Sequence, residues 1–200
     1  TGRTEVQRID GTYHYDFLLQ KYSSSGSRQW TRIWGTGNDD CGYGISVDSS
    51  KNIFICGIEN QASTSSGDFC IHKRDSSGYS LWDTSWYSSY KDVLHDIDID
   101  DQNFIYVSGL KGTSSTGYSR MFTAKCDSTG NQIWNRTTSS DTYYSYGLAR
   151  DSQNNLFVSG RRTSNFIAIK YNSSGNVLWE KTSRLGSIQA CNDISIDSED

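Results

Sequence analysis

Polar and apolar residues alternate along this chain in short runs, and no stretch keeps helical spacing for more than two turns. The first complete set of such runs covers residues 17–22, 29–34, 43–48 and 52–57. β-Branched and aromatic residues dominate these runs, and Gly, Ser, Asn and Asp cluster between them. Alternation bounded by such residues predicts short, half-buried strands joined by turns. We therefore expect an all-β protein.

One phrase recurs along the chain, at residues 21–30, 73–82, 125–134 and 170–179. Each copy begins with Lys, passes through a Gly, and ends with a Trp four residues after that Gly. A period of about 45 to 52 residues indicates an array of similar units that bury each other's faces. We therefore treat residues 1–200 as a single repeat domain. The recurring structural residues are Gly26, Gly78, Gly130, Gly175, Trp30, Trp82, Trp134 and Trp179.

Two kinds of connection alternate within a unit. The segments 24–26, 76–78, 48–52 and 151–155 have the residues of tight turns, because Gly adopts a positive φ and Asp or Asn binds its own backbone. The segments 35–42 and 58–67 are predicted to be long loops. Successive connections of an antiparallel meander lie at opposite ends. The tight turns are therefore expected at one face of the molecule and the long loops at the other.

Four antiparallel strands in each repeat correspond to one blade of a β-propeller. The predicted fold is thus an all-β propeller built from four copies of a 45–52 residue, four-stranded antiparallel unit. The repeated Trp is expected to fill the space between blades. Strands near the axis have the least room, so the innermost strands are expected at 44–48, 96–100, 147–151 and 193–197, where the residues are compact.

The repeat resembles a known family. The unit D-F-x-x-K-x-D-S-S-G-x-x-x-W … G-I-x-V-D-x-x-x-N-I-F-I-x-G is similar to the seven-bladed β-propeller (SBBP) repeat, and its Gly-x-x-x-Trp element is more weakly similar to the tryptophan-docking repeat of quinoprotein propellers. The resemblance implies a secreted or cell-surface module with a structural or binding role, and it transfers no catalytic residue. It is carried by Lys73, Asp75, Gly78, Trp82, Asp100, Asn103, Gly109 and their copies.

The number of blades stays open between a four-bladed ring, an arc of a larger ring, and an array continued in another chain. The chain begins just after one unit's Asn-to-Gly strand and stops before the next, so we expect a fragment of a longer chain or ring. Open sheet edges would then pair with other protein chains or with copies of this one. A net charge of −4 offers no basic face for nucleic acid, and no apolar run has the length of a membrane span.

Catalytic and metal sites are not predicted. The three histidines, His14, His72 and His95, do not recur in the repeat and lie in no nucleophile motif. The alternative is a propeller enzyme, quinoprotein-like or glycan-active, with a deep axial pocket ringed by non-repeating charged residues. No cofactor is expected. The alternative is calcium bound by a run of carboxylates, although turn formation also explains these residues. That run consists of Asp96, Asp98, Asp100, Asp101 and the following Asn103.

The five cysteines are an odd number without C-x-x-C spacing, which does not indicate a zinc site and leaves at least one thiol free or paired between molecules. Cys56, Cys70 and Cys126 are interpreted as small apolar strand residues. Cys41 and Cys191 occupy matching positions of their repeats and are the one pair to test as a disulfide.

Two kinds of surface site are predicted. Asn135 and Asn172 lie in N-glycosylation sequons, although Asn172 also suits an Asx turn and Asn135 requires an outermost strand. The long-loop face collects tyrosines and polar residues that suit carbohydrate or protein surfaces. These binding candidates are Asn38, Asp39, Asp40, Tyr87, Tyr90, Tyr118, Arg120, Tyr143, Tyr144, Arg161 and Arg162.

Overall fold

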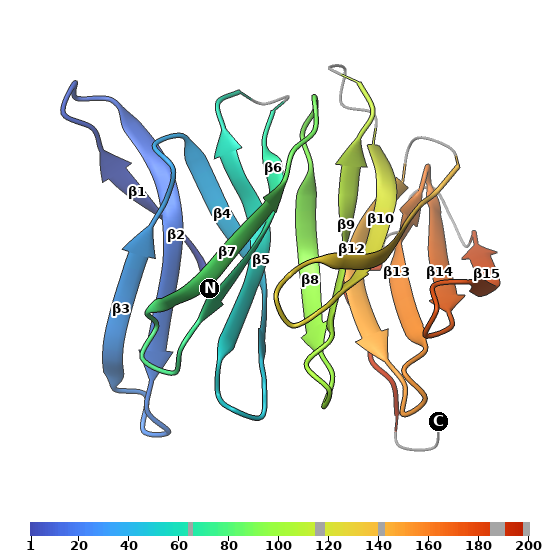
Figure 1. Cartoon of the computed structure of the whole chain (residues 1–200). Helices are drawn as coiled ribbons and strands as arrows, with labels where there is room; N and C mark the ends of the chain where they lie inside the picture. The colour runs from blue at the N-terminus through green and yellow to red at the C-terminus, as the bar shows by residue number, and fades with distance from the viewer. Residues whose placement is uncertain (64–65, 115–118, 140–142, 185–190, 198–200) are drawn as a thin grey trace.

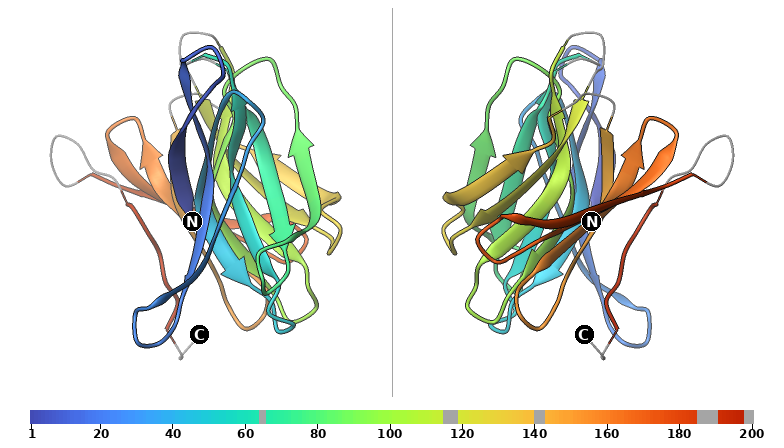
Figure 2. Two further views of the ribbon diagram at one scale, coloured as in Figure 1. Left: turned by 90° about the vertical axis from the view of Figure 1, so that its left-hand side faces the viewer. Right: turned by 90° about the vertical axis from the view of Figure 1, so that its right-hand side faces the viewer.

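The computed structural model describes residues 1–63, 66–114, 119–139, 143–184 and 191–197. Within these ranges the chain forms fifteen strands and no helix, so the all-β prediction is confirmed. The strands make up four antiparallel sheets that follow one another in chain order (Figure 1). Viewed from its two ends, the molecule shows these sheets stacked behind one another and twisted (Figure 2).

The strands of each sheet are consecutive in the sequence. The first sheet contains β1 (Gly2–Gln7), β2 (Tyr13–Tyr22) and β3 (Arg28–Trp34). The second contains β4 (Asp39–Val47), β5 (Ile53–Gln61), β6 (Asp68–Arg74) and β7 (Ser80–Trp86). The third contains β8 (Val93–Ile99), β9 (Ile105–Gly112), β10 (Ser119–Cys126) and β11 (Gln132–Thr137). The fourth contains β12 (Tyr143–Arg150), β13 (Leu156–Arg162), β14 (Asn165–Tyr171) and β15 (Val177–Ser183).

The two predicted kinds of turn are present. Gly78 has a φ of 81°, and its amide donates to the Asp75 carbonyl at 2.9 Å. In the other kind, the Asp48 carboxylate accepts the Asn52 amide at 2.8 Å. Figure 1 shows the turns β2–β3, β4–β5, β8–β9 and β12–β13 at the lower end of the sheets and the connections β3–β4 and β7–β8 at the upper end. The connection β13–β14, at the opposite end from β12–β13, consists of residues 163–164 alone, so the expectation of long loops at that end is wrong there. Turn chemistry and the meander topology therefore set the ends of the strands as expected.

The compact strands β4, β8 and β12 each form one edge of their sheet and pack against the neighbouring sheets. Gly44 allows a close approach, because a Cβ there would lie 3.0 Å from the Asp96 Cα of the next sheet. A Cβ on Gly147 would likewise lie 2.8 Å from the Asp193 Cα. Residues 193–197 thus take, against β12, the place that β8 takes against β4.

Each repeated tryptophan up to Trp134 lies on the turn glycine of the next unit. A Cβ on that glycine would meet the indole ring at 2.7–3.2 Å, so only glycine leaves room for the ring. The pairs are Trp30 with Gly78, Trp82 with Gly130, and Trp134 with Gly175. The tryptophans therefore lie between consecutive sheets, where three clusters of buried apolar residues also pack.

The strands extend further into the predicted long loops than expected. β4 already begins at Asp39 and β5 continues to Gln61, where the two strands still pair. The register shifts between Gly42 and Gly44, and this β-bulge lets the hairpin continue past the glycines. The assignment of 35–42 and 58–67 wholly to loops was therefore wrong. In the first sheet, β1 corresponds to the extended part of β5, because Gly2 pairs with Leu18 as Gly57 pairs with Cys70.

Candidate functional site between the first two sheets

A cluster of Glu59, Cys70 and His72 lies on the face of the second sheet that packs against the first. Cys70 and His72 are two residues apart on β6, and the two-residue period of a strand puts both side chains on one face. Glu59 reaches the same place from the end of the neighbouring strand β5. A ligand atom from each of the three residues lies within 4.8 Å of the others. Sequence reasoning missed this group, although the Cys-x-His spacing on a strand was a signal for it.

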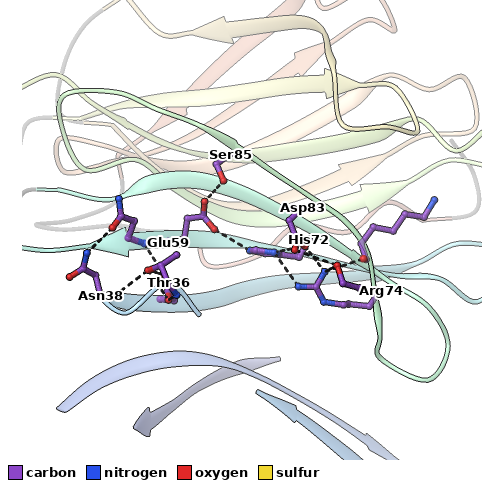
Figure 3. A network of polar contacts seen from close by, with 11 residues as sticks. Thr36, Asn38, Glu59, His72, Arg74, Asp83 and Ser85 are labelled. Carbon is purple, nitrogen blue, oxygen red and sulfur yellow. Dashed lines mark hydrogen bonds and ion pairs between the residues drawn. The ribbon is translucent and has the colours of Figure 1, made fainter. Parts of the chain in front are cut away.

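His72 is the centre of a polar network that Figure 3 shows with Glu59, Asp83, Arg74 and Ser85. His72 as a whole residue is 3% exposed, and its Nδ1 lies 2.7 Å from the Asp83 carboxylate on β7. Nε2 has no hydrogen-bond partner among the described residues and lies 3.5 Å from Glu59 Oε2. The Ser85 hydroxyl donates to the other Glu59 oxygen, and Arg74 donates to Asp83.

The two carboxylates of this network have opposite electrostatic environments. Burial raises the pKa of Asp83, but hydrogen bonds from His72 and Arg74 outweigh it and bring that pKa down to about 2. Burial raises the pKa of Glu59, and the Ser85 hydrogen bond and the charge of His72 offset it only in part. Burial also raises the pKa of the Cys70 thiol. Asp83 is therefore a fixed anion that orients His72.

Aromatic side chains from the first sheet close over the imidazole. The ring of Phe17 lies 4.6 Å from that of His72, and the ring of Trp34 lies 5.7 Å from it. Beside them a cavity of about 370 Å³ reaches the polar cluster. It is lined by Phe17, Trp34, Gly35, Thr36, Glu59, His72, Asp83, Thr84, Ser85 and Tyr87.

Some of the predicted binding residues lie near this cavity. Tyr87 lines the cavity and is 78% exposed, and the Asn38 amide donates to Asn60 at 2.7 Å. Asp39 accepts the Tyr15 amide at 3.0 Å. Asp40, which we expected on the loop surface, is instead buried, and this position corrects the expectation. Its carboxylate accepts two backbone amides, that of Thr36 at 2.6 Å and that of Asn60 on the neighbouring strand β5 at 2.7 Å. These two hydrogen bonds explain why the carboxylate is buried.

Four of the other predicted residues lie in strands rather than loops, in the third and fourth sheets: Arg120, Tyr144, Arg161 and Arg162. In the fourth sheet the Arg161 guanidinium lies 4.2 Å from the centre of the Tyr144 ring, and Arg162 pairs with Glu180 at 3.4 Å. Arg120 lies in β10, and Tyr90 is partly exposed between β7 and β8. Tyr118 and the side chain of Tyr143 fall outside the described residues. The eleven candidates therefore do not converge on one site.

A row of aromatic rings at the bulges was not anticipated. Tyr43, His95 and Tyr146 are the extra residues of equivalent bulges in β4, β8 and β12. Their ring centres are 5.4 Å apart for Tyr43 and His95, and 5.9 Å for His95 and Tyr146. His95 Nδ1 bonds the Ser145 carbonyl at 2.6 Å, and burial lowers the pKa of His95. A ring comes just before three of the four predicted inner segments, at 44–48, 96–100 and 147–151, which was the available sequence signal.

Three of the four carboxylates considered for calcium have a partner within the protein. Asp96 accepts the Leu148 amide at 2.8 Å, and Asp98 pairs with Arg150 at 3.1 Å. Asp100 accepts the Tyr106 hydroxyl at 3.0 Å. These three are therefore used in contacts that hold strands and turns together.

The sequons and the cysteines have simple local settings. Asn135 is exposed on β11, an edge strand, as a glycan there requires. The Asn172 side chain accepts the Asn176 amide at 2.8 Å, which is the Asx-turn geometry. All five cysteines are free, so the pairing of Cys41 with Cys191 is not formed. Cys41 lies in β4 and Cys191 in the segment beside β12, so equivalent positions belong to different sheets and are not neighbours.

The chain is an all-β repeat protein whose antiparallel sheets follow one another along the sequence. No protein-family model matches it, and no curated protein matches it either. Among the described residues, none form a helix with the length and apolar character that crossing a membrane requires.

Proposed function

We propose that this chain is a β-propeller repeat module, secreted or at a cell surface, with a scaffolding or binding role. The observation that carries the proposal is the repeated contact between sheets: Trp on the next turn glycine, and an inner-strand glycine against the next inner strand. Repeating one such contact adds sheets around a common axis. The similarity of the unit to the seven-bladed propeller repeat supports the same arrangement.

A binding role is favoured over the enzyme alternative by the inner rim. An axial catalytic pocket would need non-repeating charged residues around the axis. The inner strands do carry Asp96, Asp98 and Arg150, but Asp96 accepts the Leu148 amide and Asp98 pairs with Arg150, so these charges are used within the protein. The bulges of the same strands carry the aromatic row of Tyr43, His95 and Tyr146. Aromatic rings with polar tips offer contact area to glycans or proteins.

Assembly with other copies through sheet edges is part of the proposal. β4, β8 and β12 hold the inner edge of their sheets, whereas the corresponding edge of β1 has no strand partner among the described residues. Residues 193–197 have the alternating pattern of an inner strand, and Asp193 lies against Gly147 of β12 as Asp96 of β8 lies against Gly44 of β4. We propose that this segment of one copy pairs with β1 of the next.

The mass and shape of the 200-residue chain in solution test the proposal. Light scattering should give a multiple of the chain mass, and negative-stain images should show sheets around an axis. Replacing both Ile194 and Ile196 with Lys should reduce the mass to that of one chain, because both side chains are partly buried beside β12. The control changes Leu81 and Ile133, exposed on outer strands, to Lys and should leave the mass unchanged. A single-chain mass in the unaltered protein would contradict edge pairing, and a flat row of sheets would contradict the propeller.

A further inference from the structure

We infer that Glu59, Cys70 and His72 form a binding site for a transition-metal ion of the zinc type. A thiolate, an imidazole nitrogen and a carboxylate oxygen are the three ligand types that zinc takes in proteins. A thiolate ligand favours zinc-type ions over calcium and magnesium, which prefer oxygen ligands. Three protein ligands leave one position of a tetrahedral ion open, and the cavity of about 370 Å³ beside Glu59 and His72 provides room for water or a small ligand there.

The positions of His72 and Glu59 leave between them a place that suits a cation. In the tautomer that carries a proton on Nδ1 alone, His72 donates to Asp83 at 2.7 Å and Nε2 presents a lone pair. Nε2 has no hydrogen-bond partner among the described residues and lies 3.5 Å from Glu59 Oε2, which is also an acceptor. A metal ion between these two atoms would bind both of them. The Asp83–His72 pair is also the arrangement in which a carboxylate fixes the tautomer of a metal-binding histidine.

The other repeats show that the fold does not require polar residues here. The equivalent positions follow from the strand register, in which His72 lies between Ile55 and Asp83. Cys70 and His72 correspond to Phe122 and Ala124 in β10 and to Ile167 and Ile169 in β14, and Glu59 corresponds to Lys111 and Arg162. The third and fourth sheets thus have two apolar residues at the positions of Cys70 and His72 and a basic residue at the position of Glu59. The second sheet combines a thiol, an imidazole and a carboxylate at these positions.

The distances suit an ion after a small adjustment. Bonds of about 2.0–2.3 Å place the ligand atoms of tetrahedral zinc about 3.3–3.8 Å apart. His72 Nε2 and Glu59 Oε2 are already 3.5 Å apart, and the set lies within 4.8 Å. A movement of about 1 Å in the Cys70 or Glu59 side chain completes the site. Phe17 and Trp34, packed on His72, shield it from bulk water.

Metal titration of the reduced, chelator-stripped chain tests the site directly. Calorimetry with zinc chloride should give one ion per chain. Cobalt should bind at the same stoichiometry and produce a near-ultraviolet thiolate-to-cobalt band with the visible bands of a tetrahedral ion. Absence of stoichiometric zinc binding would overturn the inference. Cobalt binding without the thiolate band would also overturn it, because Cys70 would not be a ligand.

Single variants assign the ligands. Cys70→Ala should abolish the thiolate band, and Cys70→Ala, His72→Gln and Glu59→Gln should each weaken zinc binding more than about 100-fold. Asp83→Asn should weaken it about 10–100-fold, because Asp83 only orients His72. Cys56→Ala is the matched control, since Cys56 is buried in the same sheet but packs in the cluster between the second and third sheets. His95→Gln is the second control. Circular dichroism confirms folding of each variant, and the cobalt spectrum of the unaltered chain decides the question if Cys70→Ala does not fold. Zinc binding unchanged in Cys70→Ala would refute the site.

Discussion

Replacing the turn glycine Gly175 with alanine tests whether the docked tryptophan holds consecutive units together. Gly175 and Gly26 adopt the same turn, with φ of 77° and 80°. A Cβ at Gly26 would meet nothing within 4 Å, whereas one at Gly175 would lie 2.7 Å from Trp134 Cδ2 and 2.8 Å from Cε3. The two alanine variants therefore share one backbone change and differ by one contact.

The structure gives a magnitude for each variant. Alanine in the left-handed region costs about 1–2 kcal/mol, and the reduced freedom of the unfolded chain offsets about 0.4–1 kcal/mol. We therefore expect Gly26→Ala to lower the free energy of unfolding by about 1 kcal/mol. The Trp134 ring cannot move aside freely, because its indole N–H donates to the Ser173 carbonyl at 3.1 Å. Overpacking of about 1–3 kcal/mol adds to the backbone cost, so Gly175→Ala should lose about 2–4 kcal/mol.

Urea unfolding followed by circular dichroism measures both losses. A double-mutant cycle then isolates the contact: in a Trp134→Ala background the cost of Gly175→Ala should fall to that of Gly26→Ala. Equal losses for Gly26→Ala and Gly175→Ala would refute the docking argument. A cost of Gly175→Ala that is the same with and without the Trp134 ring would refute it as well.

Three further predictions follow from buried groups. Tyr106→Phe removes the hydroxyl that donates to Asp100 at 3.0 Å and should lower the free energy of unfolding by about 1–2 kcal/mol, whereas Tyr79→Phe, at an exposed ring, should change nothing; equal effects would contradict this. Burial raises the pKa of Asp92 from 3.8 to about 6, with Asp68 adding to the shift and the Gly112 amide, Ser88 and Lys111 opposing it. The folded state therefore binds more protons than the unfolded state between these values, so stability should fall as the pH rises through that window; Asp92→Asn should flatten this part of a thermal-midpoint profile, and identical slopes would count against it. A thiol reagent should modify Cys41 and Cys191 in the native protein before the buried Cys56 and Cys126, because burial raises the pKa of Cys126 to about 12; rapid native labelling of Cys56, read by peptide mass mapping, would contradict the packing.

The strands and turns were predictable because their signals are local. Alternation identified each run, and the residues at Asp48–Asn52 or around Gly78 encode their own turns. The partner of each tryptophan was not predictable, because Trp30 docks on a turn that lies 48 residues further along the chain. The extent of the hairpins was missed for a related reason: the bulge at Tyr43 depends on cross-strand register, which no single strand reveals.

The polar cluster could be predicted only in part. Cys70 and His72 share a strand, so their common face follows from sequence spacing. Glu59 and Asp83 join them only through the register of β5 and β7. Asp40 shows the opposite error: a polar residue in a predicted loop reads as surface, although its carboxylate is buried because it binds two backbone amides.

The repeat itself supplies a last test, because another sheet has apolar side chains at the positions of Cys70 and His72. β14 places Ile167 and Ile169 where β6 has Cys70 and His72. Replacing a whole buried ion pair with apolar residues of similar volume is often neutral or stabilising by about 1–4 kcal/mol, whereas removing one partner leaves a buried charge unpaired. We therefore expect the double variant Glu59→Leu, His72→Ile to have a free energy of unfolding at least equal to that of the unaltered chain in metal-free buffer, because it replaces both members of the pair.

Zinc should reverse that order. A ligand that binds only the folded state stabilises it by about 2.7 kcal/mol at a hundred times its dissociation constant. Added zinc should therefore stabilise the unaltered chain and leave the double variant unchanged in urea titrations. If the double variant is instead much less stable without metal, the cluster at His72 is a structural element of the first interface, because the polar network with Asp83 would then be needed for packing alone.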